Sequence, residues 1–384
     1  MAPSKKLPAG THFMMGNVAC AEGAVAAGCG FAAGYPITPA SEVFNTLCSR
    51  LPQAGATMMQ MEDEISAVCA AIGASWAGLK SMTVTSGPGI SLMQENIGFG
   101  VATETPLVIV DVQRLGPSTG VPSVGLAGDM VQVARGSHGD YQIIALCPQS
   151  PQEMFDLTVR AFNLAETYRV PVFVLADGFI GHMRERVVIP EEDQVPRVDR
   201  KITQGGAPLE RTDFLDPDVA PMPVFGRGFK AHVTSSCHDE RGRRNLTDPE
   251  TMHRFITNPI KKIMNYRDDI VEVEADTKGA KLVLASYGSV SRSARAAAKL
   301  AQAEGLAVGT LRLKTAWPLP DKEIREVAET ADRILVLENN TGQMFPYIKA
   351  EAASACKVDF LGPELLGQVH DPKYILAKIR GMWS

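Results

Sequence analysis

Four short segments of this 384-residue chain carry the side chains that could do chemistry. They span residues 34–42, 61–64, 85–89 and 113–120. One holds three consecutive acids, one places an arginine after an apolar run, and all but the acidic one are rich in Gly, Pro, Ser or Thr. Such residues can keep a proton on a carboxyl group, receive a ligand carboxylate on a guanidinium group, and let a ligand approach the backbone closely.

The acidic segment contains Glu62, Asp63 and Glu64, between an apolar run and the start of a predicted helix. Acids in this position commonly cap the free amides of the helix and complement its dipole. The methionines before them and the alanine-rich turns after them indicate that one of the three is buried, and burial raises the pKa of a carboxyl group. A buried carboxyl group could share a proton with a ligand nitrogen. These residues alone leave both roles open.

Three other features also have a structural and a functional interpretation. Residues 85–89 form a tight strand-to-helix connection, which could be a simple turn or a place where a ligand meets the backbone. Arg114 ends a strand and could face solvent or hold a carboxylate in two parallel hydrogen bonds. His138 and Asp140 could form a metal or base site, or only a structural hydrogen bond, and the sequence does not decide between them.

Several common motifs are missing from the sequence. It has no G-x-x-x-x-G-K-[ST] motif, which argues against a phosphate-loop nucleotide hydrolase. Residues 28–34 approach a dinucleotide-binding turn, but the glycine spacing differs by one and a predicted helix precedes them. The seven cysteines are scattered and form no C-x-x-C pair, so we expect no disulfide framework, iron–sulfur cluster or metal site on this chain.

The composition is that of a soluble globular protein, with 45% hydrophobic and 21% charged residues. A formal net charge of -5 argues against binding to nucleic acid or to an anionic membrane, because both attract basic proteins. No apolar run approaches the ~20 residues needed to cross a bilayer, and residues 1–8 are not followed by the apolar segment of a signal peptide. We therefore expect a cytoplasmic protein.

Short apolar runs alternate with segments of helical period, which predicts an α/β fold with parallel sheets. Residues 1–190 are predicted to form one doubly wound domain, with the four segments at the carboxyl ends of its strands. Its predicted strands are 57–61, 81–85, 107–112, 143–146 and 172–176, and its longest helices include 91–102 and 151–167.

Two more regions follow. Residues 191–270 are rich in proline at their start and lack clear periodicity, so we expect an irregular linker or wrapping arm. Residues 271–384 are predicted to form a second, smaller α/β domain. Its predicted strands are 282–287, 306–313, 333–338 and 357–361, separated by helices at 290–304, 321–330, 343–353 and 372–380.

Taken in order, the motifs resemble the alpha subunit of the 2-oxoacid:ferredoxin oxidoreductases. The segments that carry the resemblance are GYPITPASE at 34–42, QMEDEISA at 60–67, TVTSGPG at 83–89 with LMQEN at 92–96, VQRLGPSTG at 112–120, GSHGD at 136–140 and 156–166. The second domain, with SYGS at 286–289 and ENNTGQ at 338–343, is similar to the family's transketolase C-terminal-type domain. Only the region from 190 to about 224 is undistinguished.

The resemblance implies a fold and a cofactor site. The first domain would be a pyrimidine-binding domain of thiamine diphosphate enzymes, in which a carboxyl group shares a proton with a ring nitrogen. Sharing that proton favours the imino tautomer, which removes the proton from the reactive thiazolium carbon. By motif position that carboxyl group belongs to Glu64, and Ser86, Gly87 and Pro88 would also contact the cofactor.

The resemblance also implies a substrate site. Arg114 and Thr38 match the positions expected to hold the carboxylate of a 2-oxoacid and its neighbouring oxygen. Ser118 and Thr119 are further candidate donors to the substrate. The implied enzyme decarboxylates a 2-oxoacid oxidatively with CoA to an acyl-CoA and CO2 and reduces ferredoxin. We favour 2-oxoglutarate, which would yield succinyl-CoA, over branched-chain 2-oxoacids and pyruvate. A non-catalytic scaffold or regulatory subunit, and a transketolase-like enzyme, are the alternatives.

One expected motif is absent. The family binds diphosphate and Mg2+ through Gly-Asp-Gly followed later by Asn, and the best candidate here, at 139–141, has tyrosine in place of the second glycine. The resemblance therefore implies a beta subunit that supplies the diphosphate and Mg2+ motif and a [4Fe-4S] cluster. It also implies separate gamma and ferredoxin-like subunits, so that thiamine diphosphate would lie between the alpha and beta subunits.

Overall fold

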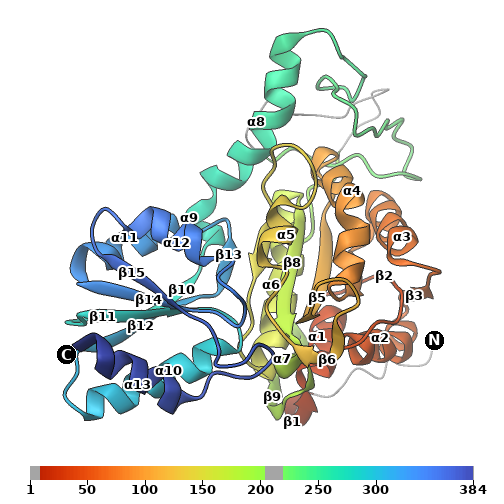
Figure 1. Cartoon of the computed structure of the whole chain (residues 1–384). Coiled ribbons are helices and arrows are strands. Elements are labelled where there is room, and N and C mark those ends of the chain that lie inside the picture. The colour runs from red at the N-terminus through yellow and green to blue at the C-terminus, as the bar shows by residue number, and fades with distance from the viewer. Residues whose placement is uncertain (1–8, 204–218, 384) are drawn as a thin grey trace.

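The structure is a computed structural model that describes residues 9–203 and 219–383. Two α/β units lie beside each other (Figure 1). The larger unit is built on a sheet with the strand order β13-β7-β8-β5-β4-β2-β3, and β6 pairs with β5. The strands are β2 Phe31–Gly34, β3 Thr57–Gln60, β4 Ser81–Thr85, β5 Leu107–Leu115, β6 Val121–Gly125, β7 Ile144–Leu146, β8 Pro171–Asp177 and β13 Thr315–Trp317. All pairings are parallel except those of β13 and β6, which confirms the expected fold class.

Helices cover both faces of this sheet. The helices are α1 Gly16–Ala26, α2 Ser41–Gln53, α3 Glu64–Trp76, α4 Pro88–Ala102, α5 Met130–Arg135, α6 Pro151–Tyr168 and α7 Gly178–His182. The strand β5 shows why both faces need cover: Val108 and Val110 pack with α1, α2 and α6, whereas Leu107 and Ile109 pack with α3, α4 and α5. Alternate side chains of a strand point to opposite faces, so the first four residues of β5, which are buried on both sides, are all apolar.

Some strands of this unit are not predicted from the sequence. The strand β2 has only the residues FAAG, and Ala and Gly have little intrinsic preference for strands. A Cβ atom on Gly34 would lie 3.0 Å from the ring of Phe44, so the close packing of α2 on β2 needs this glycine. A separate antiparallel ribbon joins β1 Gly10–Met15 to β9 Arg184–Ile189, and it too is unpredicted. These strands depend on partners distant in the chain rather than on local pattern.

The smaller unit has a five-stranded sheet in the order β10-β12-β11-β14-β15. Its strands are β10 Val273–Asp276, β11 Leu282–Ser286, β12 Val308–Leu313, β14 Arg333–Leu337 and β15 Lys357–Leu361, and its helices are α10 Val290–Ala303, α11 Asp321–Thr330, α12 Phe345–Ala352 and α13 Pro372–Trp383. Four strands are parallel and β10 is antiparallel at one edge. The elements predicted from 282 onward are therefore present.

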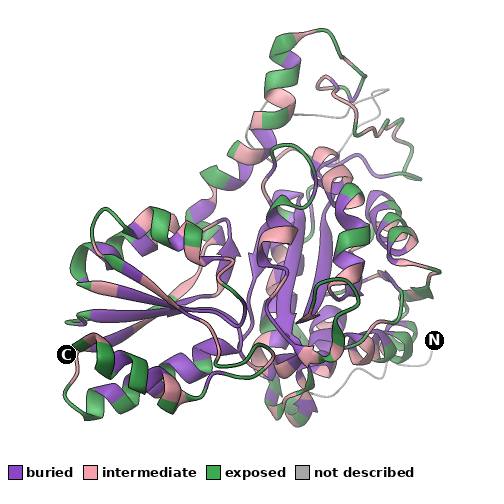
Figure 2. Ribbon diagram, viewed as in Figure 1, coloured by how far each residue is buried: buried purple, intermediate pink, exposed green. Residues whose placement is uncertain are grey.

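The two units share buried structure. One hydrophobic cluster contains Phe173 and Leu175 of the larger sheet together with Val283 and Ala285 of the smaller sheet. Figure 2 shows buried residues along the strands of both sheets. The strand β13 follows β12 in the chain but pairs with β7 of the larger sheet. The units are thus interlocked through a common core as well as joined by the chain.

The region between the units is more regular than expected. Residues 191–270 contain η1 Glu192–Gln194, α8 Pro249–Asn265 and α9 Arg267–Ile270, so the expectation of an irregular segment is wrong where α8 and α9 lie. Asp248 caps α8 by accepting a hydrogen bond from the backbone of Thr251, and Pro249 suits the first turn of the helix. Pro259 lies inside the helix, and an internal proline argues against a helix when only the sequence is considered. Part of the proline-rich region lies outside the described residues. The division at 1–190, 191–270 and 271–384 stays a prediction.

In Figure 1, α8 extends away from the two sheets. It is anchored by a buried ion pair in which Lys262 Nζ lies 2.8 Å from a carboxylate oxygen of Glu104. No helix in residues 9–203 and 219–383 has the length and apolar character needed to span a bilayer.

Candidate functional site

The four candidate segments follow neighbouring strands. Residues 34–42 follow β2, 61–64 follow β3, 85–89 follow β4, and 113–120 end β5. Since β5, β4, β2 and β3 are adjacent and parallel, their carboxyl ends meet at one edge of the sheet. Ligands bind at this edge in open parallel sheets. The structure therefore brings together the segments that the sequence singles out.

The three consecutive acids have different surroundings. Asp63 caps α3, since its Oδ1 accepts a hydrogen bond of 2.7 Å from the backbone of Ser66, whose side chain completes a capping box. Glu62 is exposed. Glu64 is the first residue of α3 and is only 5% exposed. Tertiary packing thus assigns capping to one acid and burial to another, which the sequence alone leaves undecided.

The Glu64 carboxyl group lies against the start of α4. A Cβ atom on Gly89 would lie 2.8 Å from Glu64 Oε1 and 2.0 Å from Thr85 Oγ1, so only glycine fits there. Burial raises the pKa of Glu64, and the negative charge of Asp63 adds to this. Its own backbone N–H and the positive charge of Arg114 act in the opposite direction without cancelling the increase. The helix N-terminus and burial compete at this residue, and burial dominates.

The connection at 85–89 presents buried polar groups. The hydroxyl oxygens of Thr85 and Ser86 are buried and have no hydrogen-bond partner in the described part of the chain. Gly87 has a positive φ of 24°, and Pro88 opens α4 without needing a hydrogen bond for its nitrogen. Buried hydroxyl groups without partners cost about 1–3 kcal/mol each. A polar ligand at this loop would satisfy them, which fits a heteroaromatic ring with nitrogen atoms.

Arg114 is buried at the end of β5 and does not face solvent. It is 6% exposed, and its Nη1 and Nη2 atoms donate hydrogen bonds of 2.7 and 2.9 Å to the carbonyl oxygens of Thr38 and Thr119. Its Nε atom is buried without a partner. Among residues 9–203 and 219–383, no carboxylate forms a direct ion pair with it. A guanidinium group held in place without a contacting carboxylate fits the binding of a ligand carboxylate.

The other candidate substrate residues lie around this guanidinium group. Thr38, Ser118 and Thr119 are exposed, and the structure shows contacts from Arg114 to the backbone of the two threonines. Ser118 has a positive φ of 56° in the turn that follows β5. The backbone of these segments therefore orients Arg114, while their hydroxyl groups remain available for other contacts.

The His138 and Asp140 side chains are both exposed, in the bend after α5. This bend packs on α4, where a Cβ atom on Gly98 would lie 2.3 Å from Ser137 Oγ. The contacts of Glu64 and Arg114 do not include either residue. In the described residues, no group of three His, Cys, Asp or Glu side chains is arranged to hold a metal ion.

Two buried acids of the site are not predicted from the sequence. Asp111 lies on β5 and is fully buried, and Asp129 precedes α5 and is 9% exposed. The backbone N–H of Gly87 lies next to both carboxyl groups. The acid at the end of the apolar run 107–111 is the one signal in the sequence that could have indicated Asp111. Asp129 carries no such signal, because only folding brings it to the site.

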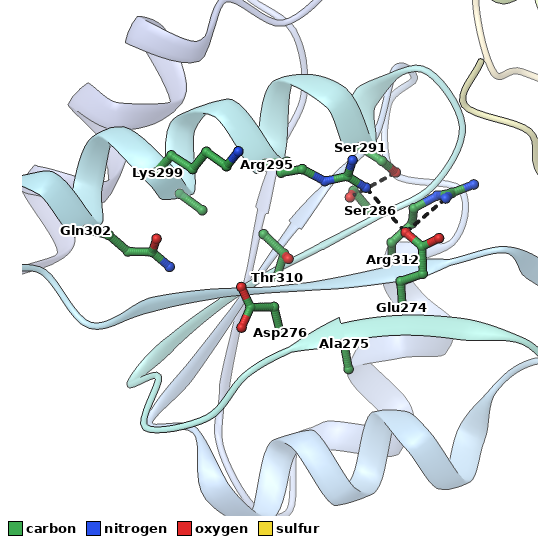
Figure 3. A pocket seen from close by; sticks show the side chains of 11 residues that line it. Glu274, Ala275, Asp276, Ser286, Ser291, Arg295, Lys299, Gln302, Thr310 and Arg312 are labelled. Carbon is green, nitrogen blue, oxygen red and sulfur yellow. Dashed lines mark hydrogen bonds and ion pairs between the residues drawn. The ribbon is translucent and has the colours of Figure 1, made fainter. Parts of the chain in front are cut away.

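The smaller unit contains a separate cavity of about 210 Å³ under α10 (Figure 3). Its arginines are already paired: Glu274 lies 3.3 Å from Arg295 and 3.0 Å from Arg312. Arg312 also pairs with Glu153 of the larger unit. The charges of these arginines are balanced within the chain, unlike the charge of Arg114, so we place the candidate site at the edge of the larger sheet.

The sequence matches two known protein families. Residues 22–257 match the family described as "Pyruvate flavodoxin/ferredoxin oxidoreductase, thiamine diP-bdg". Residues 280–373 match "Pyruvate:ferredoxin oxidoreductase core domain II". The first match covers more than half of the chain and contains all four segments of the candidate site.

Individual relatives agree with this assignment. The chain is 48% identical over 372 residues to a 2-oxoglutarate synthase subunit KorA of Methanothermobacter marburgensis, covering 97% of this chain and 99% of that protein. It is 37% identical to a ketoisovalerate oxidoreductase subunit VorB of Methanothermobacter thermautotrophicus, covering 96% of this chain and 97% of that protein.

The structure is similar to that of a 2-oxoglutarate:ferredoxin oxidoreductase from Magnetococcus marinus, with a TM-score of 0.91 and 32% identity. That match covers 98% of this chain and 66% of the Magnetococcus chain. A likeness to a split-gene transketolase, at 11% identity and a TM-score of 0.54, shows a shared fold alone. The chain therefore belongs to the 2-oxoacid:ferredoxin oxidoreductase family, as its ordered motifs indicate.

Proposed function

We propose that this chain is the alpha subunit of a thiamine diphosphate-dependent 2-oxoglutarate:ferredoxin oxidoreductase. The complete enzyme converts 2-oxoglutarate and CoA to succinyl-CoA and CO2 and reduces ferredoxin. The observation that carries the proposal is the placement of the buried Glu64 and Arg114 side chains around the loop 85–89. The choice of 2-oxoglutarate is supported by the relative at 48% identity, compared with 37% for the ketoisovalerate enzyme subunit.

The first role of this chain is to hold the pyrimidine part of the cofactor. When bound, thiamine diphosphate supplies the carbon nucleophile that makes decarboxylation possible. Glu64 would hold a proton for a ring nitrogen of the cofactor, and its raised pKa suits that task. The unpartnered Ser86 hydroxyl and the backbone at Gly87 and Pro88 line the same loop and would contact the ring.

The second role is to orient the substrate. Arg114 binds the carboxylate next to the ketone, because its Nη1 and Nη2 atoms each carry a second N–H that the bonds to Thr38 and Thr119 do not use. The hydrogen bonds to the carbonyl groups of Thr38 and Thr119 hold the guanidinium group in one orientation before the substrate binds. The exposed hydroxyl groups of Thr38, Ser118 and Thr119 are donors for the neighbouring oxygen.

The remaining parts of the enzyme belong to partner subunits in this proposal. A beta subunit supplies the diphosphate and Mg2+ site and a [4Fe-4S] cluster, and gamma and ferredoxin-like subunits complete the complex. The support is the family membership together with the missing Gly-Asp-Gly motif and the scattered cysteines. We also propose that the complex works in the cytoplasm, where ferredoxin and CoA are available.

The direct test is to isolate the complex that contains this chain and to measure CoA-dependent ferredoxin reduction with a panel of 2-oxoacids. We expect the largest kcat/KM with 2-oxoglutarate and a requirement for thiamine diphosphate. A preference for 3-methyl-2-oxobutanoate would show a branched-chain enzyme. Ferredoxin reduction with none of the acids would show a non-catalytic subunit, and activity without ferredoxin would show a transketolase-like enzyme.

A further inference from the structure

Asp111 and Asp129 form a buried pair of acids next to the candidate site. Their carboxyl groups lie within hydrogen-bonding range of each other. A Cβ atom on Gly87 would lie 3.9 Å from Asp129 Oδ2 and 3.8 Å from Arg114 Cγ, so Asp129 and Arg114 both pack against this glycine of the loop. Asp129 is further held by its backbone N–H, which donates a hydrogen bond of 2.9 Å to Gln113 Oε1.

The pair has few partners of its own. Both oxygens of Asp111 and Oδ2 of Asp129 are buried without a hydrogen-bond partner of normal geometry in the described residues. Neither side chain forms a direct ion pair there. Two buried carboxylates in contact repel each other strongly, so such a pair retains one proton between them. The proton forms the hydrogen bond that the two carboxylates otherwise lack.

The proton is unequally shared. Burial raises the pKa of Asp111 well above its ordinary value, and the charge of Asp129 raises it further. Burial also raises the pKa of Asp129, to about 6. The increase is limited because the hydrogen bond from Asp111 and the charge of Arg114 oppose the effect of burial. The larger increase in pKa belongs to Asp111, so Asp129 is the member of the pair that ionises first as the pH rises.

Asp129 is the acid whose negative charge acts most strongly on Arg114. The charged or titratable groups that act on Asp129 are Asp111 and Arg114, both on β5, and the loop before α4 contributes the backbone N–H of Gly87. Asp129 and then Glu64 are the two acids whose charges act on Arg114. Neither forms a direct ion pair with the guanidinium group in the described residues, so Arg114 is balanced electrostatically and still open to a ligand.

The smaller unit holds Asp129 in position through neutral groups. The backbone N–H of Ala127 donates to the carbonyl of Asn339 at 2.9 Å, and Asn340 Nδ2 donates to the carbonyl of Ala127 at 2.7 Å. The backbone N–H of Val131 donates to Gln343 Oε1 at 3.2 Å. The segment that carries Asp129 is therefore fixed from both ends by residues 339–343.

We propose that Asp129, supported by the proton on Asp111, is a positioning residue that balances Arg114 in the free enzyme and takes up a proton from solvent when the substrate carboxylate pairs with Arg114. This inference rests on the proposed substrate role of Arg114. It assigns a task to two acids that the reaction itself does not use. It also explains why the motif at 338–343, in the other unit, contacts this site.

The direction of the pH effect follows from charge. A bound carboxylate at Arg114 removes part of the positive field that favours the ionised form of Asp129, and its own negative charge disfavours that form further. Between the pKa of Asp129 in the free enzyme and its higher value in the complex, binding takes up a proton, so affinity falls as pH rises. When the carboxylate leaves as CO2, Arg114 again pairs electrostatically with Asp129, and the proton returns to solvent.

The test uses the complete enzyme complex and 2-hydroxyglutarate, an inhibitor that keeps both carboxylates but has no ketone to react. For the wild type, we expect the inhibition constant to rise about tenfold or more between about pH 6 and about pH 8. Calorimetry in buffers of different ionisation enthalpy should show proton uptake on binding near pH 7. In D129N the inhibition constant should depend much less on pH over this range, with less proton uptake than the wild type and tighter binding at the upper end, because only the weaker effect of Glu64 on Arg114 remains.

Matched measurements separate the outcomes. D193N changes an exposed aspartate in η1 and should behave as the wild type. A wild-type inhibition constant that does not change with pH, or a pH dependence in D129N as steep as in the wild type, would overturn the inference. If D129N does not assemble, proton uptake by the wild type still decides, because its absence alone rules the mechanism out. Failure of the wild type to oxidise any 2-oxoacid would instead contradict the proposed function.

Discussion

At the scale of single residues, Glu64 shows how neighbouring side chains of the same type can have different roles. Replacing Glu64 by Gln keeps its size but removes the titratable proton. We expect assembly and thermal stability close to those of the wild type, and kcat for 2-oxoglutarate-dependent ferredoxin reduction to fall about 10²- to 10⁴-fold, the range of general acid–base effects. The matched control is E62Q, because Glu62 is an exposed neighbour. Near-normal turnover in E64Q would contradict the role of Glu64.

Arg114 is expected to act on substrate affinity. R114A removes a charge-assisted, bidentate contact worth about 3 kcal/mol, which corresponds to roughly a 100-fold rise in KM for 2-oxoglutarate. Binding of thiamine diphosphate, measured by its protection against thermal unfolding, should persist. R186A is a suitable control, since Arg186 is an exposed arginine on β9. An unchanged KM would show that the substrate carboxylate binds elsewhere.

Gly89 tests the packing around Glu64. In G89A the new methyl group would lie 2.0 Å from Thr85 Oγ1 and 2.7 Å from Glu64 Cγ, so these groups must move. We expect a loss of about 1–3 kcal/mol in unfolding free energy and reduced cofactor protection. In the control G73A, no atom lies within 4 Å of the added Cβ atom in α3. G73A should stabilise the helix by about 0.5–1 kcal/mol. If G89A and G73A change the free energy of unfolding equally in a denaturant titration, the packing argument is contradicted.

At the scale of elements, the loop before α12 supports the segment before α5. Asn340 donates to the carbonyl of Ala127 and accepts hydrogen bonds from the backbone of Gly342 and Gln343. N340A removes these hydrogen bonds and leaves the buried carbonyl of Ala127 without its donor, so we expect about 2–4 kcal/mol of destabilisation by chemical unfolding, together with a higher KM. In contrast, T341A changes an exposed side chain of the same loop and should shift stability by less than about 0.5 kcal/mol. If N340A is destabilised but its KM is unchanged, the loop before α12 does not influence substrate binding at the site.

Elements were predictable from the sequence to the extent that their own residues specify them. The strand β8 and the first half of β5 are apolar runs buried on both faces, and such runs predict strands of a parallel sheet. In contrast, β2 and β13 are short, and their pairing partners are distant in the chain. The helix α8 is masked by an internal proline and by its charged residues. These elements are specified by tertiary contacts rather than by local periodicity.

At the scale of the whole molecule, the two units share one hydrophobic cluster and β13 adds to the sheet of the other unit. Trp317 on β13 is 2% exposed, and its indole N–H donates to the carbonyl of Met130 at 2.7 Å. We expect the units to unfold together, because separating them exposes this common core. Tryptophan fluorescence and far-UV circular dichroism should report the same thermal transition. Two resolved transitions would show that the units are independent.

The sequence by itself determined the α/β class, the strands that lead into three of the four segments, and the family to which the chain belongs. These features depend on local periodicity and on motifs in which nearly all positions are adjacent in the chain. It also limited the candidates for the acid that contacts the cofactor to three neighbouring residues, and the family resemblance selected Glu64 among them.

Only the tertiary structure decided which acid is buried, how Arg114 is held, and which distant groups act on it. Exposure, electrostatic field and hydrogen-bond partners depend on side chains that meet through folding, as Asp129 meets Arg114 through a loop held by the smaller unit. A pKa is a property of that environment rather than of residue type or spacing. For this reason the sequence does not predict that Asp111 and Asp129 form a pair, and only the tertiary structure shows it.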